Sequence, residues 1–388
     1  MLLVAEPTLG AEEKAALAAV IDGGWITMGD RVAAFERAFA AAHGVADAVA
    51  IGSCTAGLHL VLESLGIGPG DEVLVPAVTF VATANAVLHA GATPVFVDIE
   101  GLGQPLMSLA DAATKRTERT KAVILVDYAG YLTDGGAWRA FAAAHGLRLI
   151  EDAAHAAGAE GAGAIGDAGV FSFYGNKNMT TAEGGMVFAR DPAVLERVRR
   201  LRGHGITSST RQRLTGHAQG YDVTMLGYNH RMDELRAAVG LVQLASLPAW
   251  NARRRALTGA YRALLERRCP DVLMPFAAGS GAGPQPSSHH ILPVLLPDGA
   301  DRDAVVEALR ADGIQTSVHY APVHLFTFYR ERCPGVSLPL TEAFARRELT
   351  LPLHPKMEEA QVEAVVRSLS QALARSDVRG VAVMEGSE

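Results

Sequence analysis

Short apolar runs alternate with stretches of helical periodicity between about residues 45 and 190. This alternation is typical of βα units, and strands that are apolar throughout indicate a mostly parallel sheet covered by helices on both faces. A turn is predicted at Gly68-Pro69-Gly70-Asp71, directly before one of these strands. The predicted strands span residues 48–51, 72–75, 94–98, 122–126, 147–152, 170–173 and 185–189. The predicted helices between them include residues 56–65, 81–89 and 134–145.

The remaining third of the chain has a different pattern. Amphipathic periodicity predicts a helix at residues 233–247 and a second, charged helix at 253–267. The stretch 277–288 is rich in Gly, Pro, Ser and Ala and predicts a surface loop. A strand at 290–296 and helices at 301–312 and 358–373 follow, and we expect the end from Arg375 to fray.

These elements predict an α/β protein of two domains. We expect a large domain over residues 1–247 and a smaller α+β domain over residues 248–388, with roughly residues 1–20 packing on the small domain. A length of 388 residues fits two domains, and 49% hydrophobic with 20% charged residues is normal for a soluble globular protein.

Charge and cysteine content exclude several classes of function. A net charge of −7 argues against a nucleic-acid surface, although a locally positive pocket could still bind a small anion. We expect no membrane segment and no signal peptide, because the apolar runs are too short for either. The three cysteines, Cys54, Cys269 and Cys333, lie far apart and form no CxxC pair, so neither a disulfide framework nor a zinc knuckle is predicted. A cytoplasmic location fits best.

Candidate chemistry begins with Glu151-Asp152, an acidic pair that closes an apolar strand. Ligands of open α/β sheets bind at the carboxyl ends of the strands, where such an acid could neutralise a cation or bind a metal. A solvated acid at a plain strand end explains this fragment alone equally well.

A second candidate is the polar turn after the strand that delivers Ser172. It holds one lysine, Lys177, among amide and hydroxyl groups, and a Gly184-Gly185 pair follows. Such a lysine near a carboxylate suits Schiff-base chemistry, although most lysines are merely exposed. The third candidate, Gly52-Ser53-Cys54-Thr55-Ala56-Gly57, is a strand-to-helix turn whose N–H groups could hold a phosphate.

The combination is more specific than its parts. A phosphate turn, an acid on a later strand and a serine five residues before a lysine follow the order of parts in fold-type I pyridoxal phosphate (PLP) enzymes, the aspartate aminotransferase-like group. Over nearly its whole length the sequence resembles the DegT/StrS-type sugar aminotransferases. The resemblance rests on GPGDEV at 68–73, PAVTFVATAN at 76–85, TPVFVD at 93–98, EDAAHAAG at 151–158, the segments 166–174 and 177–185, GYNHRMDELRAAVG at 227–240 and VHYAPVHL at 318–325.

The resemblance implies roles for residues around the cofactor, pyridoxal 5'-phosphate. Lys177 matches the lysine that bonds to the cofactor and moves the proton between substrate and cofactor carbons. Asp152 matches the acid that pairs with the pyridine nitrogen, so the ring can act as an electron sink. His155 matches a residue near the cofactor's 3-oxygen, and Phe80 matches an aromatic that stacks on the ring, although either could simply pack in the core.

The resemblance also implies a shared site. Ser172 would hold the phosphate together with Cys54 and Thr55, where Cys54 replaces a common glycine and should contribute its backbone at most. Asn229 matches an asparagine that reaches the cofactor phosphate of the neighbouring subunit, so we expect a homodimer. His230 departs from the family's usual tyrosine, which puts that residue's substrate contact in doubt.

Substrate contacts are predicted from weaker matches. Arg231 could contact an anion or simply pair with Asp233 or Glu234. The small-domain residues His319, Tyr320 and His324 could line the substrate pocket.

The resemblance implies an aminotransferase that takes its amino group from L-glutamate and gives it to a nucleotide-linked keto-sugar. Some relatives aminate keto-cyclitols or related ketones instead, and this alternative stays open. Relatives with a histidine in place of the lysine are sugar dehydratases, and Lys177 argues against that group. A non-catalytic regulator on the same fold would have no need for Lys177, Asp152 and Ser172 together.

Overall fold

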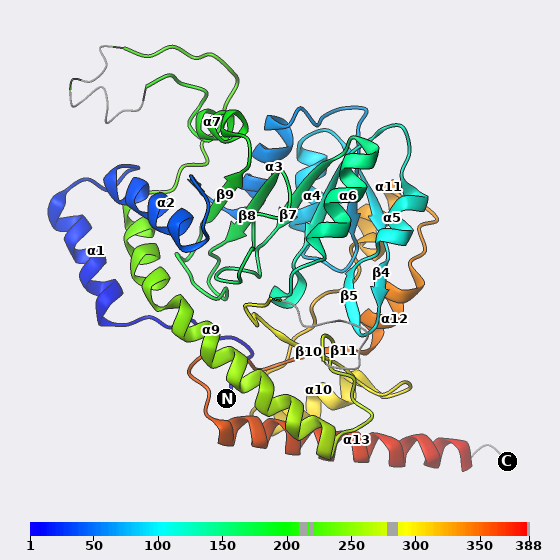
Figure 1. Ribbon diagram of the computed structural model, residues 1–388. Coiled ribbons are helices and arrows are strands. Elements are labelled where there is room, and N and C mark those ends of the chain that lie inside the picture. Colours follow the sequence, from blue (N-terminus) through cyan, green and yellow to red (C-terminus); the bar gives the residue numbers. More distant parts are fainter. Residues whose placement is uncertain (209–215, 217–219, 278–285, 386–388) are drawn as a thin grey trace.

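The computed structural model describes residues 1–388 except 209–215, 217–219, 278–285 and 386–388. Its centre is a seven-stranded sheet with the order β1-β9-β8-β7-β6-β2-β3 (Figure 1). The strands are β1 (Val49–Ile51), β2 (Glu72–Pro76), β3 (Thr93–Val97), β6 (Thr120–Val126), β7 (Arg148–Asp152), β8 (Ala168–Ser172) and β9 (Gly185–Ala189).

Neighbouring strands run parallel from β3 across to β8, and β9 runs antiparallel to both β8 and β1. This confirms the mostly parallel sheet that the apolar strands predicted. β9 runs antiparallel to β8, so residues 173–184 form a short connection between these two strands at the carboxyl end of β8. This connection carries Lys177.

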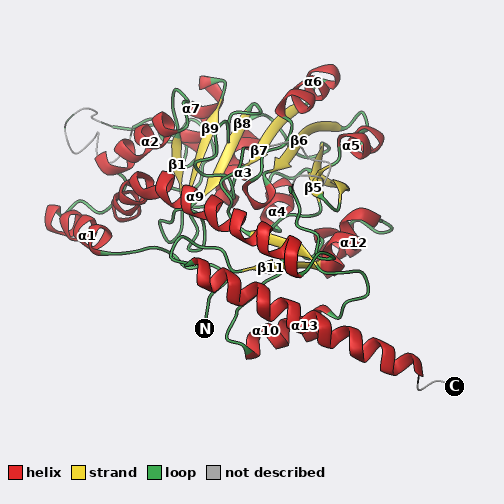
Figure 2. Ribbon diagram, turned by 60° about the horizontal axis from the view of Figure 1, so that its bottom comes forward, coloured by secondary structure: helices red, strands yellow, loops and turns green. Residues whose placement is uncertain are grey.

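Helices cover both faces of the sheet, as Figure 2 shows. On one face lie α2 (Asp30–Ala42), α6 (Gly135–His145) and the first half of α9 (Glu234–Arg268), and they bury Phe35, Phe39 and Trp138 against the strands. On the other face lie α3 (Cys54–Ser64), α4 (Ala82–His89) and α7 (Pro192–Leu201). Burial of these apolar surfaces on two faces is the main source of stability of such a layered fold.

A smaller α+β unit packs against this layered body. Its two-stranded sheet, β10 (Leu292–Leu295) with β11 (Glu348–Leu351), is antiparallel. Its core is closed by the second half of α9, by α10 (Arg302–Ala311) and by α13 (Glu359–Glu385). Shorter elements complete the chain: α1 (Ala11–Gly23), β4 (Ile99–Gly101), β5 (Gln104–Met107), α5 (Leu109–Lys115), η1 (Tyr128–Gly130), η2 (Val323–Leu325), α11 (Thr327–Arg332) and α12 (Pro339–Arg347).

The expectation of two helices at 233–247 and 253–267 was wrong, because α9 is one helix of 35 residues with Pro248 inside it. Proline removes one helical hydrogen bond, yet the two halves of α9 pack in two different cores, and this tertiary packing outweighs the loss. The boundary that we place between residues 247 and 248 therefore falls within a helix.

The two ends of the chain also differ from expectation. Only the first residues pack on the small unit: Leu2 pairs with Ile314 and the Leu353 amide donates to the carbonyl of Val4, whereas α1 packs on α9. The end does not fray at Arg375, since α13 continues to Glu385. No proline follows Leu373, and an established helix propagates at little cost.

The carboxyl ends of the parallel strands lie at one edge of the large sheet. Asp152 is the last residue of β7 and Ser172 is the last residue of β8. The first residue of α3, Cys54, follows β1 at the same edge. None of the helices among the described residues has both the length and the apolar character needed to cross a bilayer.

Candidate active site

The turn that carries Lys177 is fixed by hydrogen bonds at both ends. The Lys177 amide donates to the carbonyl of Tyr174 at 3.0 Å, and the Thr181 amide donates to the carbonyl of Phe173 at 2.9 Å. The adjacent side chain, Asn178, is buried and donates to Asn251 Oδ1 at 2.8 Å and to the carbonyl of Ser288 at 2.9 Å. The position of Lys177 is therefore set by α9 and by residue 288 as well as by the sheet.

The amine of Lys177 has no hydrogen-bond or ion-pair partner among the described residues. Burial lowers its pKa to about 8, and the negative charge of Asp152 works in the opposite direction. Desolvation disfavours the charged form, so about a tenth of the amine is neutral at pH 7 and about half at pH 8, far more than for an ordinary lysine. A neutral, unpaired amine is the form that attacks a carbonyl carbon.

Asp152 is held by a hydroxyl and an amide. Thr83 Oγ1 donates to Asp152 Oδ2 at 2.8 Å, and the Ala154 amide donates to Oδ1 at 3.2 Å. Burial raises the pKa of Asp152, while these two hydrogen bonds and the charge of Lys177 oppose the rise. The site thus presents a fixed carboxyl that a cationic partner would keep ionised.

The α3 N-terminus offers an anion site beside Ser172. Ser53 caps the helix by accepting from the Ala56 amide at 3.2 Å, while the amides of Cys54 and Thr55 have no acceptor among the described residues. In the sheet register Gly185 pairs with Ile51 on one side and with Ser172 on the other, which brings the Ser172 hydroxyl close to this turn. Free amides and the helix dipole there favour a phosphate.

The thiol of Cys54 points into the protein. Its Sγ lies 3.8 Å from Asp152 Oδ1 and 3.7 Å from the carbonyl of Val170. Burial raises the pKa of this thiol well above its usual value, and the charge of Asp152 adds to the rise. A thiol that stays protonated is a poor nucleophile, so no thiol chemistry is expected of Cys54.

His155 lies between the two structural units. Its Nδ1 accepts from the Ala129 amide at 3.2 Å, and its Nε2 lies 2.8 Å from Tyr320 Oη. Because Nδ1 is the acceptor of a backbone N–H, the neutral ring carries its proton on Nε2 and donates to Tyr320. Burial lowers the pKa of His155 well below its usual value, with Lys177 adding to the effect, so the ring stays neutral.

Phe80 and Tyr320 flank the open side of the site. The Phe80 side chain is 60% exposed in the single chain, and its ring centroid lies 6.2 Å from that of Tyr320. An exposed phenylalanine beside recessed polar groups is a surface suited to covering a planar ligand.

The segment that contains Asn229 and Arg231 lies at the surface, next to the phosphate turn. The Gly52 amide donates to the carbonyl of His230 at 2.7 Å, and Asn229 is exposed. Arg231 has no ion-pair partner among the described residues. Asp233 pairs with Arg236, and the Glu234 carboxylate accepts from the amides of residues 29, 31 and 32.

The structure brings His319 into the site's surroundings but places His324 elsewhere. His319 is near enough to Lys177 for the lysine's charge to lower its pKa, and its Nδ1 lies 2.8 Å from Thr350 Oγ1. The buried His324 contacts Glu342 at 3.2 Å and lies against Phe96. His324 therefore packs between units and does not join the group around Lys177.

Three polar residues near the site were not singled out from the sequence: Thr83, Glu348 and Thr350. The strand 348–351 alternates polar and apolar residues, with Glu348 and Thr350 on one face and Leu349 and Leu351 on the other. This period of two could have predicted a half-polar strand. Thr83 carries no comparable signal, since its role depends on α4 meeting β7.

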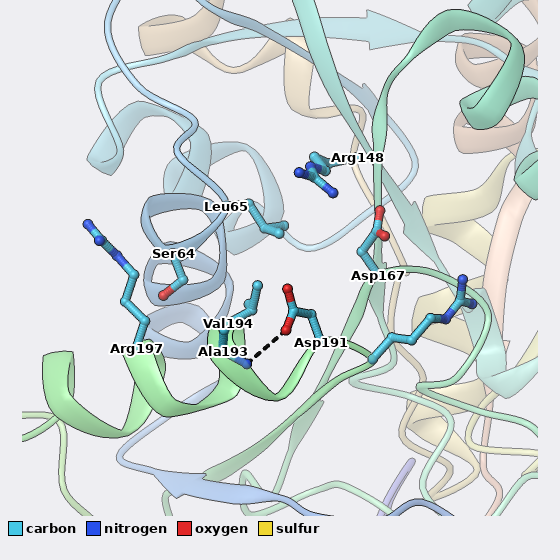
Figure 3. Close-up of a pocket in the computed structure, with 9 residues that line it drawn as sticks. Ser64, Leu65, Arg148, Asp167, Asp191, Ala193, Val194 and Arg197 are labelled. Atoms are coloured by element: carbon cyan, nitrogen blue, oxygen red, sulfur yellow. Dashed lines mark hydrogen bonds between the residues drawn. The ribbon is translucent and has the colours of Figure 1, made fainter.

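A cavity of about 540 Å³ lies at the opposite ends of the strands (Figure 3). Arg148, which begins β7, and Asp167, which precedes β8, line it together with the end of α3 and the start of α7. Asp152 ends the strand that Arg148 begins, so this cavity is separate from the site around Lys177.

The family model of the DegT/DnrJ/EryC1/StrS aminotransferases matches residues 7–370. The chain belongs to this family. This confirms the resemblance inferred from the motifs, and it makes the protein an aminotransferase whose cofactor is pyridoxal phosphate.

Solved structures agree with this assignment. The aminotransferase TlmJ from Streptoalloteichus hindustanus is 35% identical, with 97% of this chain and 99% of that chain covered and a TM-score of 0.88. DesI is 32% identical, with 98% and 95% covered and a TM-score of 0.86. The putative sugar aminotransferase Spr1654 from Streptococcus pneumoniae, solved in its PMP form, is 28% identical, with 97% and 100% covered and a TM-score of 0.88.

The residues of this aminotransferase fit the cofactor. The amine of Lys177 is recessed and lacks a partner among the described residues, and the buried carboxyl of Asp152 lies near it. The amides of Cys54 and Thr55 lack acceptors within the described chain at a helix N-terminus. An aldehyde, a pyridine nitrogen and a phosphate are the groups that these three features suit.

Proposed function

We propose that this aminotransferase moves an amino group from L-glutamate to a nucleotide-linked keto-sugar, in an active site that two subunits share. The observation that carries the proposal is the amine of Lys177, recessed and without a partner among the described residues, beside a carboxyl that Thr83 holds in place. A regulator would have no use for a lysine kept partly neutral by burial.

The cofactor would be held by residues of three elements. Asp152 would face its ring nitrogen, Ser172 and the amides of Cys54 and Thr55 would hold its phosphate, and Phe80 would cover its ring. When bound, pyridoxal phosphate supplies an aldehyde that condenses with amines and a protonated ring that withdraws electrons from the carbon bearing the amine. The charge of Asp152 would keep that nitrogen protonated.

Lys177 would transfer protons once the substrate's amine has taken its place on the cofactor and its own amine is free. The neutral form of a lysine with a pKa near 8 could take the proton from the α-carbon of glutamate and deliver it to the cofactor carbon that carried the aldehyde. His155 is hydrogen-bonded to the Tyr320 hydroxyl, and this pair would lie near the cofactor's 3-oxygen and affect its charge. The His155 ring is held by the Ala129 amide and the Tyr320 hydroxyl, and the backbone of Lys177 is fixed by its turn, which leaves the lysine amine free to move.

The nucleotide-linked acceptor is supported by a relative and by an arginine near the site. DesI, which is 32% identical, was solved in the presence of its TDP-sugar product. Phe80, beside Tyr320, is 60% exposed, so this side of the site is uncovered in the single chain. Arg231 has no ion-pair partner among the described residues and would suit a phosphate. A cyclitol without phosphate would leave that arginine unused.

The shared site is supported by the surface around Asn229. Asn229 is exposed in the single chain, and the segment before it exposes large apolar residues, with Leu226 85% and Val223 56% accessible. Large apolar side chains that are exposed close together on one segment are more typical of an interface than of free surface. We propose that this face packs on a second copy, so that Asn229 of the partner subunit reaches the phosphate.

A glutamate-dependent amination screen tests the function. Purified enzyme with cofactor is offered nucleotide keto-sugars and unphosphorylated keto-cyclitols, and formation of 2-oxoglutarate is measured. We expect turnover with at least one nucleotide keto-sugar, and a loss of at least about 10³-fold in Lys177→Ala together with loss of the visible absorbance of bound cofactor. Turnover with keto-cyclitols alone would show that the acceptor is a keto-cyclitol and not a nucleotide-linked keto-sugar. Undiminished turnover in Lys177→Ala would refute the role of Lys177.

A further inference from the structure

A chain of hydrogen bonds runs from the core of the small unit to the site. Thr350 Oγ1 lies 2.5 Å from Glu348 Oε1 and 2.8 Å from His319 Nδ1. The second carboxyl oxygen, Glu348 Oε2, accepts from the His319 backbone amide at 2.8 Å. Glu348 and Thr350 are fully buried, so water does not compete for these bonds.

The surroundings of Glu348 favour its protonated form. Burial raises its pKa to about 8, while Thr350, the His319 amide and the charge of Arg302 oppose the rise. Burial raises the pKa of Tyr128 and of Tyr320, and the negative charge of an ionised Glu348 adds to both rises, so the three groups are close enough to oppose one another's ionisation. Arg302 gives only partial compensation, because its guanidinium hydrogen-bonds the carbonyls of residues 345 and 348. At neutral pH the carboxyl therefore carries a proton.

The His319 ring stays neutral beside this acid. Burial lowers its pKa to about 4, and the positive charge of Lys177 adds to the effect. A neutral imidazole has one N–H, so the hydrogen bond at Nδ1 decides which nitrogen carries it. With Glu348 protonated, the acid donates to Thr350, Thr350 donates to Nδ1, and His319 carries its proton on Nε2. With Glu348 ionised, Thr350 donates to the carboxylate and Nδ1–H of His319 donates to Thr350, so the ring proton lies on Nδ1.

The His319 ring lies close enough to Lys177 for the lysine's charge to add to the lowering of its pKa that burial causes. Nε2 makes no hydrogen bond with any residue that the structure describes. The ring stands edge-on to Tyr320, with centroids 4.9 Å apart, and Tyr320 is the residue that bonds to His155. The Tyr128 hydroxyl donates to the His319 carbonyl and fixes the backbone at this point. His319 is thus positioned by buried groups and leaves one nitrogen available.

We propose that Glu348, Thr350 and His319 form a proton relay in which Nε2 of His319 exchanges a proton with the oxygen that enters or leaves as water during amino transfer, and Glu348 stores that proton. The inference rests on the proposed function, because only a reaction that exchanges C=O for C–N needs this oxygen to gain and lose protons. Glu348 and Thr350 are positioning residues that act through His319.

The proton balance closes over one cycle. In the acceptor half-reaction, His319 Nε2–H breaks as an O–H bond forms on the keto oxygen. Nδ1 takes the hydroxyl proton of Thr350, which in turn takes the carboxyl proton of Glu348, so the acid becomes a carboxylate. In the glutamate half-reaction a hydroxyl proton passes to Nε2 while the carbonyl of 2-oxoglutarate forms, and the same bonds reverse to restore the acid.

Kinetics of the holoenzyme test the relay. Thr350→Val keeps the shape of the side chain but breaks the chain, whereas Thr350→Ser keeps the hydroxyl. We expect Thr350→Val to slow the acceptor half-reaction at least about tenfold in kcat with little change in KM, and Thr350→Ser to recover most of the rate. The matched control is Thr341→Val, since the buried Thr341 hydroxyl has no partner among the described residues.

A spectroscopic readout does not depend on turnover. In protein with ¹⁵N-labelled histidine, the ring resonances of His319 are identified by their absence in His319→Gln. We expect the proton of the neutral ring to move from Nε2 to Nδ1 as pH rises through about 8, the pKa of Glu348. In Glu348→Gln the side-chain oxygen should accept from the His319 backbone amide, as Glu348 Oε2 does, so the NH2 group donates to Thr350 and should hold the proton on Nε2 at every pH.

The outcomes separate the relay from the proposed function. A ring proton that moves with pH in the wild type and stays on Nε2 in Glu348→Gln supports the relay, even if Thr350→Val folds poorly. A His319 tautomer that is independent of pH, or equal rates and pH profiles in Thr350→Val and Thr350→Ser, overturns the relay while glutamate-dependent amination persists. Absence of amination in the wild type with every acceptor would instead contradict the proposed function.

Discussion

The hydroxyl of Thr83 donates a 2.8 Å hydrogen bond to the carboxyl of Asp152, and both groups are buried. This bond opposes the rise in the pKa of Asp152 that burial causes. An ionised Asp152 is what would keep the cofactor's ring nitrogen protonated, so Thr83 supports the electron-withdrawing state of the ring without touching the substrate.

Replacement of Thr83 should therefore move the pH profile as well as the rate. Thr83→Val removes the donor but keeps the shape, so the pKa of Asp152 rises, and we expect the acid limb of kcat/KM to shift to higher pH with a loss of about tenfold near neutral pH. Thr83→Ser keeps the hydroxyl and should restore the wild-type profile. An unchanged acid limb in Thr83→Val would show that the bond has no effect on the charge of Asp152.

The state of Lys177 predicts how fast the cofactor binds. Its pKa is lowered to about 8 by burial, so the neutral amine becomes dominant above that pH. We expect the rate at which cofactor-free enzyme takes up pyridoxal phosphate, followed by visible absorbance, to rise with pH and level off above about 8.

A midpoint near the ordinary value of lysine would contradict this environment for Lys177. Lys356, which is paired with Glu6 at the surface, offers a matched control: Lys356→Ala should leave the uptake profile unchanged.

Much of the fold followed from local pattern, because strands buried on both faces are continuous apolar runs. β7 was predicted at 147–152 and found at Arg148–Asp152, and β8 was predicted at 170–173 and found at Ala168–Ser172. The hairpin of β4 and β5 was missed, since Gly101, Gly103 and Pro105 make its sequence resemble a loop. Pro248 suggested a break in α9 that tertiary packing overrides.

The candidate site, too, could be predicted from the sequence only in part. Lys177, Asp152 and Ser172 lie in contiguous motifs, so their grouping could be predicted. The contact of His155 with Tyr320 joins positions 165 residues apart, and the chain from Glu348 to His319 depends on β11 meeting the segment before Tyr320. Such contacts form only when distant segments of the chain pack together, and local periodicity in the sequence does not predict them.

A buried acid pair behind the site predicts how stability depends on pH. Asp127 and Glu151 are fully buried, and the Asp127 carboxyl has no partner in good hydrogen-bond geometry among the described residues. Burial and the neighbouring Glu151 raise the pKa of Asp127 well above its usual value, and burial also raises that of Glu151. A raised pKa in the folded state means that the folded chain binds a proton that the unfolded chain releases.

The stability that this proton supplies is fully present below the unfolded pKa of about 4 and is lost as pH rises through the raised folded pKa. Asp127→Asn has no carboxyl to ionise, so its free energy of unfolding should fall less than that of the wild type between about pH 5.5 and about pH 8.5, by about 1–3 kcal/mol. Urea unfolding at both pH values measures the difference. The exposed Asp22→Asn is the control, and parallel behaviour of Asp127→Asn and wild type would refute the prediction.

A shared active site predicts that two inactive variants complement one another. In a dimer of Lys177→Ala with Asn229→Ala, one site would combine the intact Lys177 of one subunit with the intact Asn229 of the other, and the second site would carry both changes. Random mixing makes half of the dimers mixed, so we expect about a quarter of the wild-type activity to return on co-refolding the two variants. Asn229 is exposed in the single chain and has no side-chain hydrogen bond to any described residue, so its replacement should not disturb the fold. The contradicting outcome is a mixture whose activity only equals the mean of the two variants. It would mean that Asn229 and Lys177 serve the same subunit's site, or that Asn229 does not contact the cofactor.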